Sequence, residues 1–414
     1  MSAQSRLNSL STQLTGSGAS RLTAQSPDDI VVTCALRTPF TRGGKGGFKD
    51  TAGADLLAAA LGGVLTRSGI SPNLVEDIAV GNVLAPGGGA TEFRAAALLA
   101  GFPESTAVHS LNRQCSSGLQ ACVEVANAIK AGMIDVGIGA GVESMSSQYG
   151  PGAVTEFSEK LEEHERAKEC KVPMGVLSED MAKDKGIERQ KQDRFAAESY
   201  RKAGEAWKGG LFDQEVLPVK VQWVDPKTDE TREIEVKRDD GVRDVTVESL
   251  GKIRPAFAKD GSIHAGNASQ VSDGAAAVLL MKRSTAQRLG QKILGKYVTA
   301  SVVGVPPLLM GIGPWKAIPV ALEKAGITKE DVDIYEINEA FASQCVWCVE
   351  ELGLPMEKVN PKGGAIAFGH PLGCTGARQV STLLYELKRQ NKKVGVTSMC
   401  VGTGMGMAAV WVAE

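Results

Sequence analysis

The sequence has no apolar run near the roughly 20 residues that a membrane-spanning helix needs, so we expect no membrane span. It also has no basic excess, because 46 lysines and arginines stand against 48 aspartates and glutamates, a net charge of −2. A nucleic-acid or membrane-surface partner requires a basic face, so the composition argues against both. The eight cysteines have no regular spacing, which argues against a disulfide framework and favours a reducing compartment.

What the sequence does contain is typical of a globular protein. Hydrophobic residues make up 43% and charged residues 23% of a chain of 414 residues, long enough for two or more domains with full cores. Its 48 glycines exceed the usual share and gather in loops. This distribution indicates places where the backbone approaches another backbone or a ligand closely.

The order of predicted strands and helices repeats along the chain. Landmarks of the two regions are separated by a nearly constant offset of about 257 residues (327 − 70), which indicates an internal duplication. Three pairs show it: Ile70 and Ile327, Ile78 and Ile334, Gly137 and Gly395. The alternation of strands and helices predicts two α/β halves, each with a largely parallel sheet.

Residues 146–261 lie outside this repeat and are rich in charge. We interpret them as an insertion that covers the functional site. The segment from His264 to Met281 then returns to the first half, because Ala275–Leu280 is a continuous apolar run typical of a buried strand.

Cys115 occupies a predicted turn between a short strand, Ala107–Leu111, and a helix that Gly132 ends. The helix shows one apolar face, formed by Leu119, Cys122, Val123, Ala126 and Ile129. Free backbone N–H groups and the helix dipole at such a start favour an anion, which predicts a thiol that ionises easily and acts as a nucleophile. The competing interpretation is a small buried cysteine at a tight turn.

Three further motifs carry chemistry: Asn338-Glu339-Ala340-Phe341, Gly369-His370-Pro371-Leu372-Gly373, and the glycine-rich stretch from Cys400 to Gly406. A histidine can activate the Cys115 thiol, and a second cysteine adds a proton carrier with a pKa nearer neutrality than that of serine. The N–H groups of a glycine loop suit an oxyanion hole. Together the motifs predict acyl transfer through a thioester, with a proton moved to or from a carbon acid.

With these four motifs in this order, the sequence resembles the thiolase family over residues 29–414, and within it the degradative 3-ketoacyl-CoA thiolases of peroxisomes. The resemblance implies a duplicated α/β fold, in which two βαβαβαββ-type halves form a five-layered α-β-α-β-α core with an inserted loop domain. The expected division is a targeting tail at 1–28, an N-terminal half at 29–145 plus 262–290, a CoA-binding loop domain at 146–261 and a C-terminal half at 291–414.

The resemblance also implies the roles of five residues. Cys115 is the nucleophile that takes the acyl group, and His370 lowers its pKa and activates it. Cys400 protonates the leaving acetyl-CoA enolate and then deprotonates the incoming CoA thiol. Asn338 holds a water that, with His370 Nε2, binds the substrate thioester oxygen, and the N–H groups of Cys115 and Gly402 bind the oxygen of the acyl-enzyme.

Coenzyme A is expected as a co-substrate, with no permanently bound cofactor and no metal. The resemblance places seven residues along its path, from the adenine end to the acyl pocket: Arg243, Ser249, Ser269, Met174, Phe257, Met310 and Phe341. For Met310 and the phenylalanines, packing in the core is an equal alternative. Pro173 stands where the biosynthetic branch carries a histidine.

The first 27 residues have no acidic side chain and are rich in serine, threonine and glutamine. Within them, residues 6–14 begin with Arg6-Leu7 and end with Gln13-Leu14, which resembles the type 2 peroxisomal targeting nonapeptide. We therefore expect the peroxisomal type 2 import receptor as a partner and the peroxisome as the location. A mitochondrial matrix presequence and a disordered tail are the alternatives. The family implies a homodimer, with 3-ketoacyl-CoA and CoA as substrates.

Other chemically suggestive residues are interpreted as structural. Cys345 and Cys348 form a lone CxxC pair in a predicted helix, too few ligands for zinc. His109 is expected to be structural and His164 solvated, whereas His264 has an alternative role near the ligand. Cys34, Cys122 and Cys170 are also expected to be structural.

Three alternative functions stay open. A biosynthetic acetoacetyl-CoA thiolase would run the same chemistry in the other direction. A condensing ketoacyl or polyketide synthase would share the fold, but Cys400 in its glycine loop argues against it. A non-catalytic lipid-binding protein of the same fold would have lost Cys115, His370 or Cys400, and all three are present.

Overall fold

The computed structural model describes residues 18–150 and 156–414. In the first half the elements follow the predicted order closely: β1 (Ile30–Arg37), β2 (Thr41–Arg42), α3 (Gly53–Ser68), β3 (Asp77–Gly81), α4 (Ala90–Leu99), β4 (Ala107–Leu111), α5 (Ser117–Lys130) and β5 (Val136–Ser144). The first half is completed by β8 (Ser272–Lys282), which is almost entirely buried and pairs with both β1 and β5. The predicted return of the chain to the first half is therefore confirmed.

The second half repeats this order: β9 (Gly295–Gly304), α12 (Gly313–Ala325), β10 (Ile334–Ile337), α13 (Ala342–Glu351), α14 (Ala365–Phe368), α15 (Thr375–Arg389), β11 (Val394–Val401) and β12 (Met405–Ala413). Helix α11 (Arg283–Arg288) lies between the two halves in the sequence. The strand orders match as well: β1-β8-β5-β3 in the first half corresponds to β9-β12-β11-β10 in the second. The internal duplication read from the sequence is thus visible in the topology.

The two sheets meet where β1 pairs with β9, which gives the strand order β10-β11-β12-β9-β1-β8-β5-β3-β4. The expectation of largely parallel sheets is wrong, since among these strands only β3–β4, β3–β5 and β10–β11 pair in parallel. The reason is that each half ends in a strand running back beside the previous one. In the second half a tight glycine turn joins β11 directly to β12, and such a hairpin can only be antiparallel.

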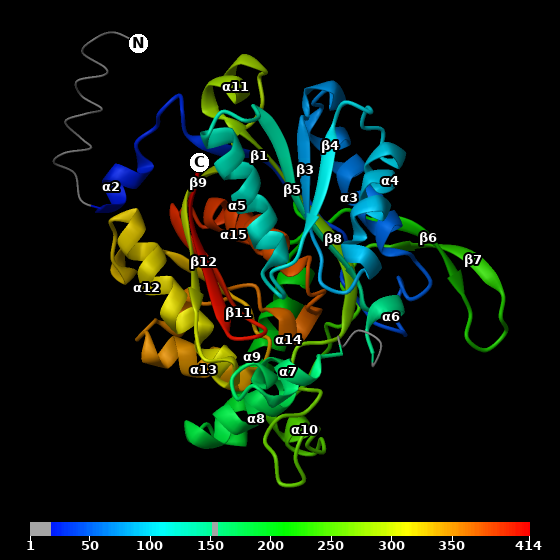
Figure 1. Cartoon of the computed structure of the whole chain (residues 1–414), viewed down its shortest axis with the longest axis vertical. Coiled ribbons are helices and arrows are strands. Elements are labelled where there is room, and N and C mark those ends of the chain that lie inside the picture. The colour runs from blue at the N-terminus through cyan, green and yellow to red at the C-terminus, as the bar shows by residue number, and fades with distance from the viewer. Residues whose placement is uncertain (1–17, 151–155) are drawn as a thin grey trace.

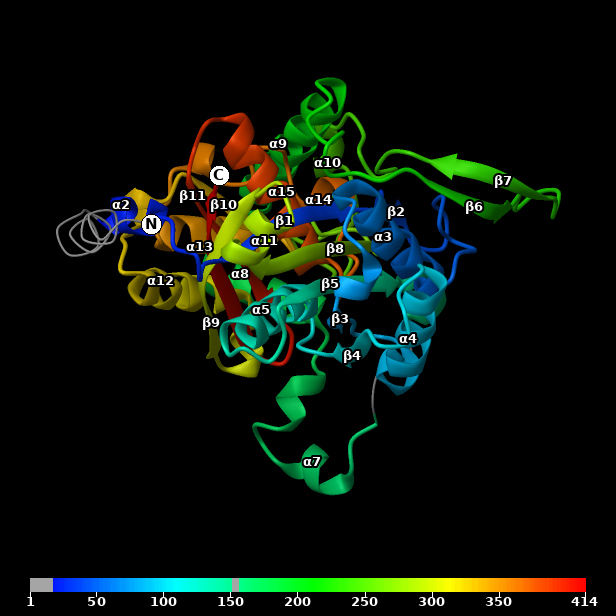
Figure 2. The same ribbon diagram turned by 90° about the horizontal axis from the view of Figure 1, so that it is seen from above.

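The helices and sheets form five layers (Figures 1 and 2). Helices α3 and α4 cover the outer face of the first sheet, α5 and α15 lie together between the two sheets, and α12 covers the outer face of the second. Three apolar clusters fill the spaces between these layers. The predicted apolar face of α5 is buried completely or nearly so, and burial of each of its larger side chains, Leu119, Val123 and Ile129, contributes roughly 2 kcal/mol.

The insertion forms a mostly helical region beside the ends of the two central helices (Figure 1). It contains α6 (Met145–Gln148), α7 (Glu159–Glu163), α8 (Met174–Asp184), α9 (Arg189–Lys208), the hairpin β6 (Val219–Val224) and β7 (Thr231–Val236), and α10 (Val247–Gly251). Helix α9 packs against α13 and α14 of the second half. This packing holds the insertion over the loops that follow the central strands. Within the described residues no helix is both long and apolar enough to cross a membrane.

The described end of the N-terminal tail lies against the second half. Helix α2 (Gly18–Thr23) buries no residue fully, but Leu22 packs against the apolar cluster beneath α12. The Lys296 ammonium donates a hydrogen bond of 2.6 Å to the carbonyl of Ala24. The predicted targeting nonapeptide, residues 6–14, lies outside the described residues.

Candidate active site

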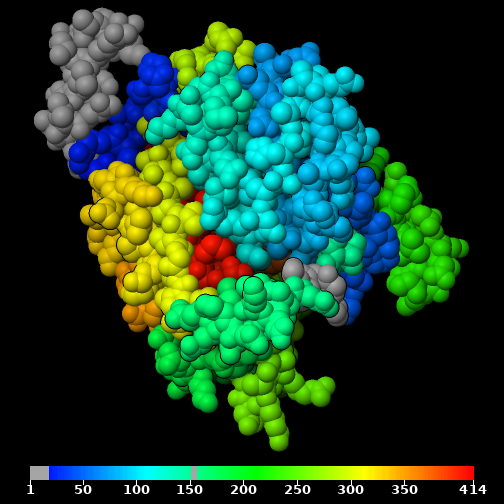
Figure 3. All heavy atoms as spheres, in the orientation of Figure 1, coloured from blue at the N-terminus to red at the C-terminus, as the bar shows by residue number. Residues whose placement is uncertain are grey.

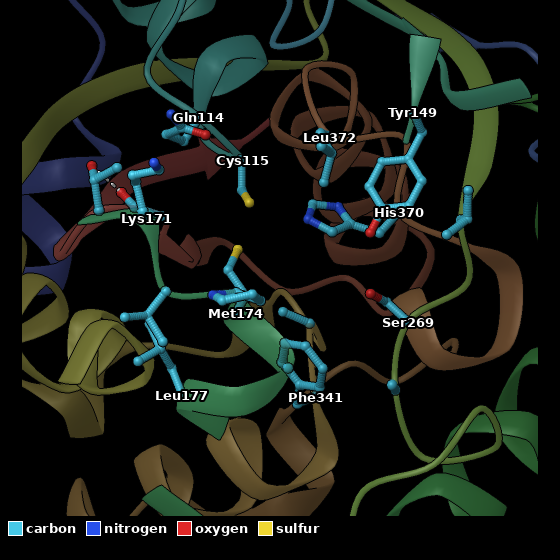
Figure 4. A pocket seen from close by; sticks show the side chains of 18 of the residues that line it. Gln114, Cys115, Tyr149, Lys171, Met174, Leu177, Ser269, Phe341, His370 and Leu372 are labelled. Atoms are coloured by element: carbon cyan, nitrogen blue, oxygen red, sulfur yellow. Dashed lines mark hydrogen bonds between the residues drawn. The ribbon is translucent and has the colours of Figure 1, made fainter. Parts of the chain in front are cut away.

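A cavity of about 720 Å³ lies where the two halves and the insertion meet. Figure 3 shows C-terminal residues, in red, at the surface between the first half, the second half and the insertion. The sequence motifs supply Cys115, His370, Gly402 and Phe341 to its wall. In Figure 4 the Cys115 thiol and the His370 ring point into the cavity, with Met174 and Phe341 across from them. The structure therefore brings together motifs that are up to about 290 residues apart (402 − 115).

Cys115 stands in the turn between β4 and α5, as predicted, and is only 2% exposed. The residue before it, Gln114, has a φ of 48°, which a side chain other than that of glycine rarely adopts. Side-chain bonds hold this turn, because Asn112 Oδ1 accepts from Gln114 N at 2.8 Å and Ser117 Oγ accepts from Arg113 N at 2.9 Å. Backbone strain of this kind is characteristic of sites whose geometry is fixed for function.

The prediction that the helix start lowers the pKa of Cys115 is wrong for this geometry. Burial raises the pKa of the Cys115 thiol to about 11, and the charge of Glu143 acts in the same direction. The N–H groups of Gly402 and of Cys115 itself oppose the rise by donating toward the sulfur. Because desolvation dominates, the thiol is neutral at rest and must lose its proton to a base as it reacts.

The His370 ring lines the same cavity as Cys115 and can accept such a proton. Its Nδ1 lies 2.6 Å from the Thr375 hydroxyl, which in turn donates to the carbonyl of Pro371 at 3.0 Å. A hydroxyl that donates elsewhere accepts from Nδ1–H, so Nε2 carries the free lone pair. Burial, and secondarily the positive charge of Arg378, lowers the pKa of His370 to about 3, which keeps the ring neutral and able to take a proton.

Asn338 directly follows β10 and is 1% exposed. Its Nδ2 lies 3.3 Å from His370 Nε2, and its backbone N–H donates to the carbonyl of Ser398 in β11 at 2.9 Å. The amide thus reaches the reactive nitrogen of His370 directly. The two side chains lie together, and the water-holding role expected for Asn338 stays a prediction.

Cys400 lies near the end of β11, fully buried, in an apolar cluster with Leu177, Met310 and Ala340. Leu177 and Ala340 also line the cavity, so Cys400 sits immediately behind its wall. Burial raises the pKa of the Cys400 thiol well above its usual value, and the nearby Cys115 adds to the rise. The two sulfurs are therefore close enough to affect each other's charge.

The loop after Cys400 carries the second strained residue. Thr403 has a φ of 67° and follows Gly402 in the turn between β11 and β12. A Cβ on Gly402 would lie 3.4 Å from the Gln114 side chain, so the two strained turns face each other. The N–H groups of Gly402 and Cys115 both lower the pKa of the Cys115 thiol, so both donors lie next to the sulfur.

The residues expected along the CoA path separate into two groups. Ser269, Met174, Phe257 and Phe341 line the cavity. The other three do not: Met310 packs against Cys400, Arg243 stacks over the Tyr200 ring at 5.2 Å, and Ser249 caps α10 through a capping box with Thr246.

The remaining histidines serve other purposes. His264 is fully buried, with Nε2 2.7 Å from Asp193, and does not line the cavity. His109 lies between Asp77 and Glu124, whose hydrogen bonds raise its pKa to about 9, in agreement with a structural role. His164 is exposed, as expected for a solvated residue.

Cys34 and Cys122 are buried, whereas Cys170 is partly exposed and lines the cavity. Cys345 and Cys348 are buried free thiols of α13. In the described part of the chain no group of three or more histidines, cysteines or carboxylates could hold a metal.

Sequence reasoning missed several residues of the site. Thr375, which orients His370, is the first residue of α15 and follows the motif of His370 closely. Tyr149, Phe157 and Lys171 line the cavity from the insertion. Their irregular segment gives no periodic pattern from which their side chains can be placed.

Comparison with known proteins gives the same family for both halves. Residues 30–284 match the family described as "Thiolase, N-terminal domain", and residues 291–413 match "Thiolase, C-terminal domain". The peroxisomal 3-ketoacyl-CoA thiolase of Yarrowia lipolytica is 57% identical over 413 residues, covering 99% of this chain and 100% of the relative.

Two solved structures from Saccharomyces cerevisiae are similar throughout. The dimeric peroxisomal thiolase, at 49% identity, covers 95% of this chain and 100% of its own with a TM-score of 0.89. A second structure, of peroxisomal 3-ketoacyl-CoA thiolase, has 44% identity, the same coverage and a TM-score of 0.78. It is described as five layers built from two core domains of identical topology, the architecture found in this chain. The chain belongs to the thiolase family.

Proposed function

We propose that the chain is a peroxisomal 3-ketoacyl-CoA thiolase of fatty-acid β-oxidation, an acyltransferase that cleaves 3-ketoacyl-CoA with CoA to acetyl-CoA and a shortened acyl-CoA. The observation that carries this proposal is that one cavity wall brings together the buried Cys115 thiol, the His370 ring and Gly402, with the Cys400 thiol directly behind it. The full-length relatives named as peroxisomal 3-ketoacyl-CoA thiolases support it.

The first half-reaction starts from the neutral pair. His370 Nε2 takes the Cys115 proton as the sulfur attacks the 3-keto carbon, and the N–H donors stabilise the developing negative charge. The C2–C3 bond then breaks, leaving the acyl group on Cys115 and the electron pair on the enolate of acetyl-CoA. Cys400 gives its proton to that carbon, which releases acetyl-CoA.

The second half-reaction returns the enzyme to its starting state. The Cys400 thiolate takes the proton of the incoming CoA thiol, and the CoA sulfur attacks the thioester on Cys115. The tetrahedral oxygen lies against the N–H groups of Cys115 and Gly402, and collapse releases the shortened acyl-CoA. The leaving Cys115 thiolate recovers its proton from His370.

CoA is a co-substrate in this scheme. We assign Ser269, Met174, Phe257 and Phe341 to its pantetheine and to the start of the acyl group, supported by their place in the cavity wall. Arg243 and Ser249 are assigned to the adenine end, outside the cavity. Met310 acts from behind the wall by shaping the pocket through Cys400 and Ala340.

The proposed domain division is the one expected from the sequence. It has an N-terminal half at 29–145 plus 262–290, a CoA-binding loop domain at 146–261 and a C-terminal half at 291–414.

A thiolysis assay with two substrates tests the proposed function. We expect cleavage of both acetoacetyl-CoA and a long-chain 3-ketoacyl-CoA, with higher kcat/KM for the longer chain, because the cavity is large and mostly apolar. The measurement is loss of the 3-ketoacyl-CoA enolate absorbance on addition of CoA. Activity on acetoacetyl-CoA alone would indicate the biosynthetic alternative, and no activity on either would indicate a non-catalytic protein.

We also propose that the chain forms a homodimer, supported by the dimeric yeast structure.

We further propose that the chain is imported through residues 6–14, which bind the peroxisomal type 2 receptor. The tail is expected to direct import without affecting catalysis. A fluorescent reporter fused behind residues 1–28 should enter peroxisomes, and Leu7→Arg in the same fusion should stay in the cytosol because Leu7 belongs to the Arg6-Leu7 pair that begins the nonapeptide. Entry into mitochondria would contradict this assignment.

A further inference from the structure

The loop that carries His370 is inserted tightly into the opposite half of the molecule. Its last residue, Gly373, contacts the backbone of the first half at three glycines: Gly81, Gly118 and Gly141. A Cβ on Gly118 would lie 2.6 Å from the Gly373 carbonyl, so no other residue fits there without a shift. Gly118 lies in the first turn of α5, three residues after Cys115. The position of this loop therefore fixes the distance between the base and the nucleophile.

One buried carboxylate joins the two sides of this contact. Glu143, near the end of β5, is 0% exposed. Its Oε2 accepts from Gly373 N at 2.8 Å and from Val83 N at 3.1 Å, while its Oε1 accepts from Leu84 N at 3.1 Å and from Asn82 Nδ2 at 3.0 Å. Three of these donors belong to the first half, and the shortest bond goes to the His370 loop.

This arrangement requires a carboxylate. Among the described residues no lysine or arginine pairs with Glu143, so its charge is balanced only by N–H donors. Burial raises the pKa of Glu143 to about 7, which shows that the site is costly for a charge. A glutamine cannot replace it. Its amide can be placed in two orientations, and in each of them the NH₂ group would face two N–H donors.

We propose that Glu143 is a positioning residue for the reaction: its carboxylate clasps the turn of residues 82–84 to Gly373 and thereby holds His370 over Cys115. This inference rests on the proposed roles of Cys115 and His370. Leu84 and Leu372, which flank the clasp, both line the cavity, so the same bonds shape the wall next to the reacting thiol. Loss of the clasp displaces the base without removing any group that touches the substrate.

The test is Glu143→Gln, compared with Glu386→Gln as a matched control. Glu386 is likewise buried, at 1% exposed. Its hydrogen-bond partners, Arg389 and Gln390, lie at the C-terminal end of its own helix α15 and do not line the cavity. We expect kcat of E143Q to fall about 100-fold with KM within threefold of wild type, as for a base displaced by about 1 Å. E386Q should keep wild-type kcat. Both variants are assayed at least 10 °C below their own measured Tm, and Glu143→Asp, with its shorter arm, replaces E143Q if that variant does not fold.

A double-variant comparison separates positioning of His370 from general loosening of the structure. If Glu143 acts through His370, E143Q should slow H370A by less than twofold, because the displaced group is already absent. Acetylation of Cys115 by acetyl-CoA, followed by intact-protein mass spectrometry, resolves these slow variants. The clasp would be overturned if folded E143Q kept wild-type kcat. It would also be overturned if the rate loss of the double variant equalled the product of the losses in E143Q and H370A. Failure of the wild-type enzyme in the thiolysis assay would instead overturn the proposed function.

Discussion

Cys115→Ala is expected to abolish thiolysis, with a loss in kcat of roughly four orders of magnitude or more, because the covalent route disappears. The fold should be unaffected, since alanine is smaller than cysteine and the turn is held by bonds from Asn112 and Ser117. The measurement is kcat for 3-ketoacyl-CoA cleavage, with Tm recorded alongside. Intact-protein mass spectrometry should also show no acetyl adduct after incubation with acetyl-CoA.

Cys34→Ala is the matched control for this variant. Cys34 is 3% exposed and lies in β1, where its pKa is raised to about 11 by burial just as that of Cys115 is. Its removal should leave both kcat and the acetyl adduct at wild-type levels. Substantial cleavage by the Cys115 variant, or an acetyl adduct mapped to another cysteine, would contradict the assignment of the nucleophile.

The duplication could be predicted because each half repeats its strands, helices and turn residues at one offset. The helix predicted between Cys115 and Gly132 is present as α5, Ser117–Lys130. Strand direction could not be predicted in the same way. The direction in which β8 runs beside β1 and β5 depends on where the 146–261 insertion ends in space. The sequence of this irregular insertion has no periodic pattern from which that position could be predicted.

The identities of the reacting groups could be predicted, but not their charge states. The helix start before Ser117 suggested an ionised thiol, whereas the complete burial of the thiol by segments distant in sequence reverses the direction of the pKa shift. The positive φ angles of Gln114 and Thr403 could not be predicted, because glycine is the residue that usually indicates such a conformation and neither position has one. Glu143 could have been noticed as the one acidic residue in a strand otherwise composed of small and apolar residues, Val136–Ser144.

Local hydrogen bonds account for the residues that lie away from the cavity. Ser249, which we propose for the adenine end of CoA, already has a local partner, because its hydroxyl donates to the Thr246 carbonyl at 2.8 Å in the capping box of α10. Capping is the common use of serine at a helix start, and one sequence gives no means of deciding between a cap and a ligand contact. The same holds for Arg243, whose guanidinium is held at the Tyr200 ring.

Cys400→Ser is expected to separate the two halves of the chemistry. In the proposed mechanism Cys400 moves a proton to or from carbon, and a serine hydroxyl has too high a pKa to do this quickly. Burial already raises the pKa of the thiol at this position, and a hydroxyl there would be weaker still as an acid. Cleavage of 3-ketoacyl-CoA should therefore fall by about three orders of magnitude. Transfer of an acetyl group from acetyl-CoA to Cys115 should continue, because a CoA thiolate leaves without needing a proton on carbon.

Deuterium exchange at the acetyl methyl group of acetyl-CoA measures the Cys400 step directly. In D₂O the wild-type enzyme should exchange these protons, as followed by NMR, while Cys400→Ser should show acetylated Cys115 by mass spectrometry and almost no exchange. Cys348→Ser is the control, since Cys348 is an equally buried thiol next to the same cluster, and its hydrogen bond to the Gly311 carbonyl can be made by a serine. Near-normal exchange in the Cys400 variant would remove Cys400 from the mechanism. Loss of both exchange and acetylation would mean that Cys400 maintains the Cys115 site rather than carrying a proton.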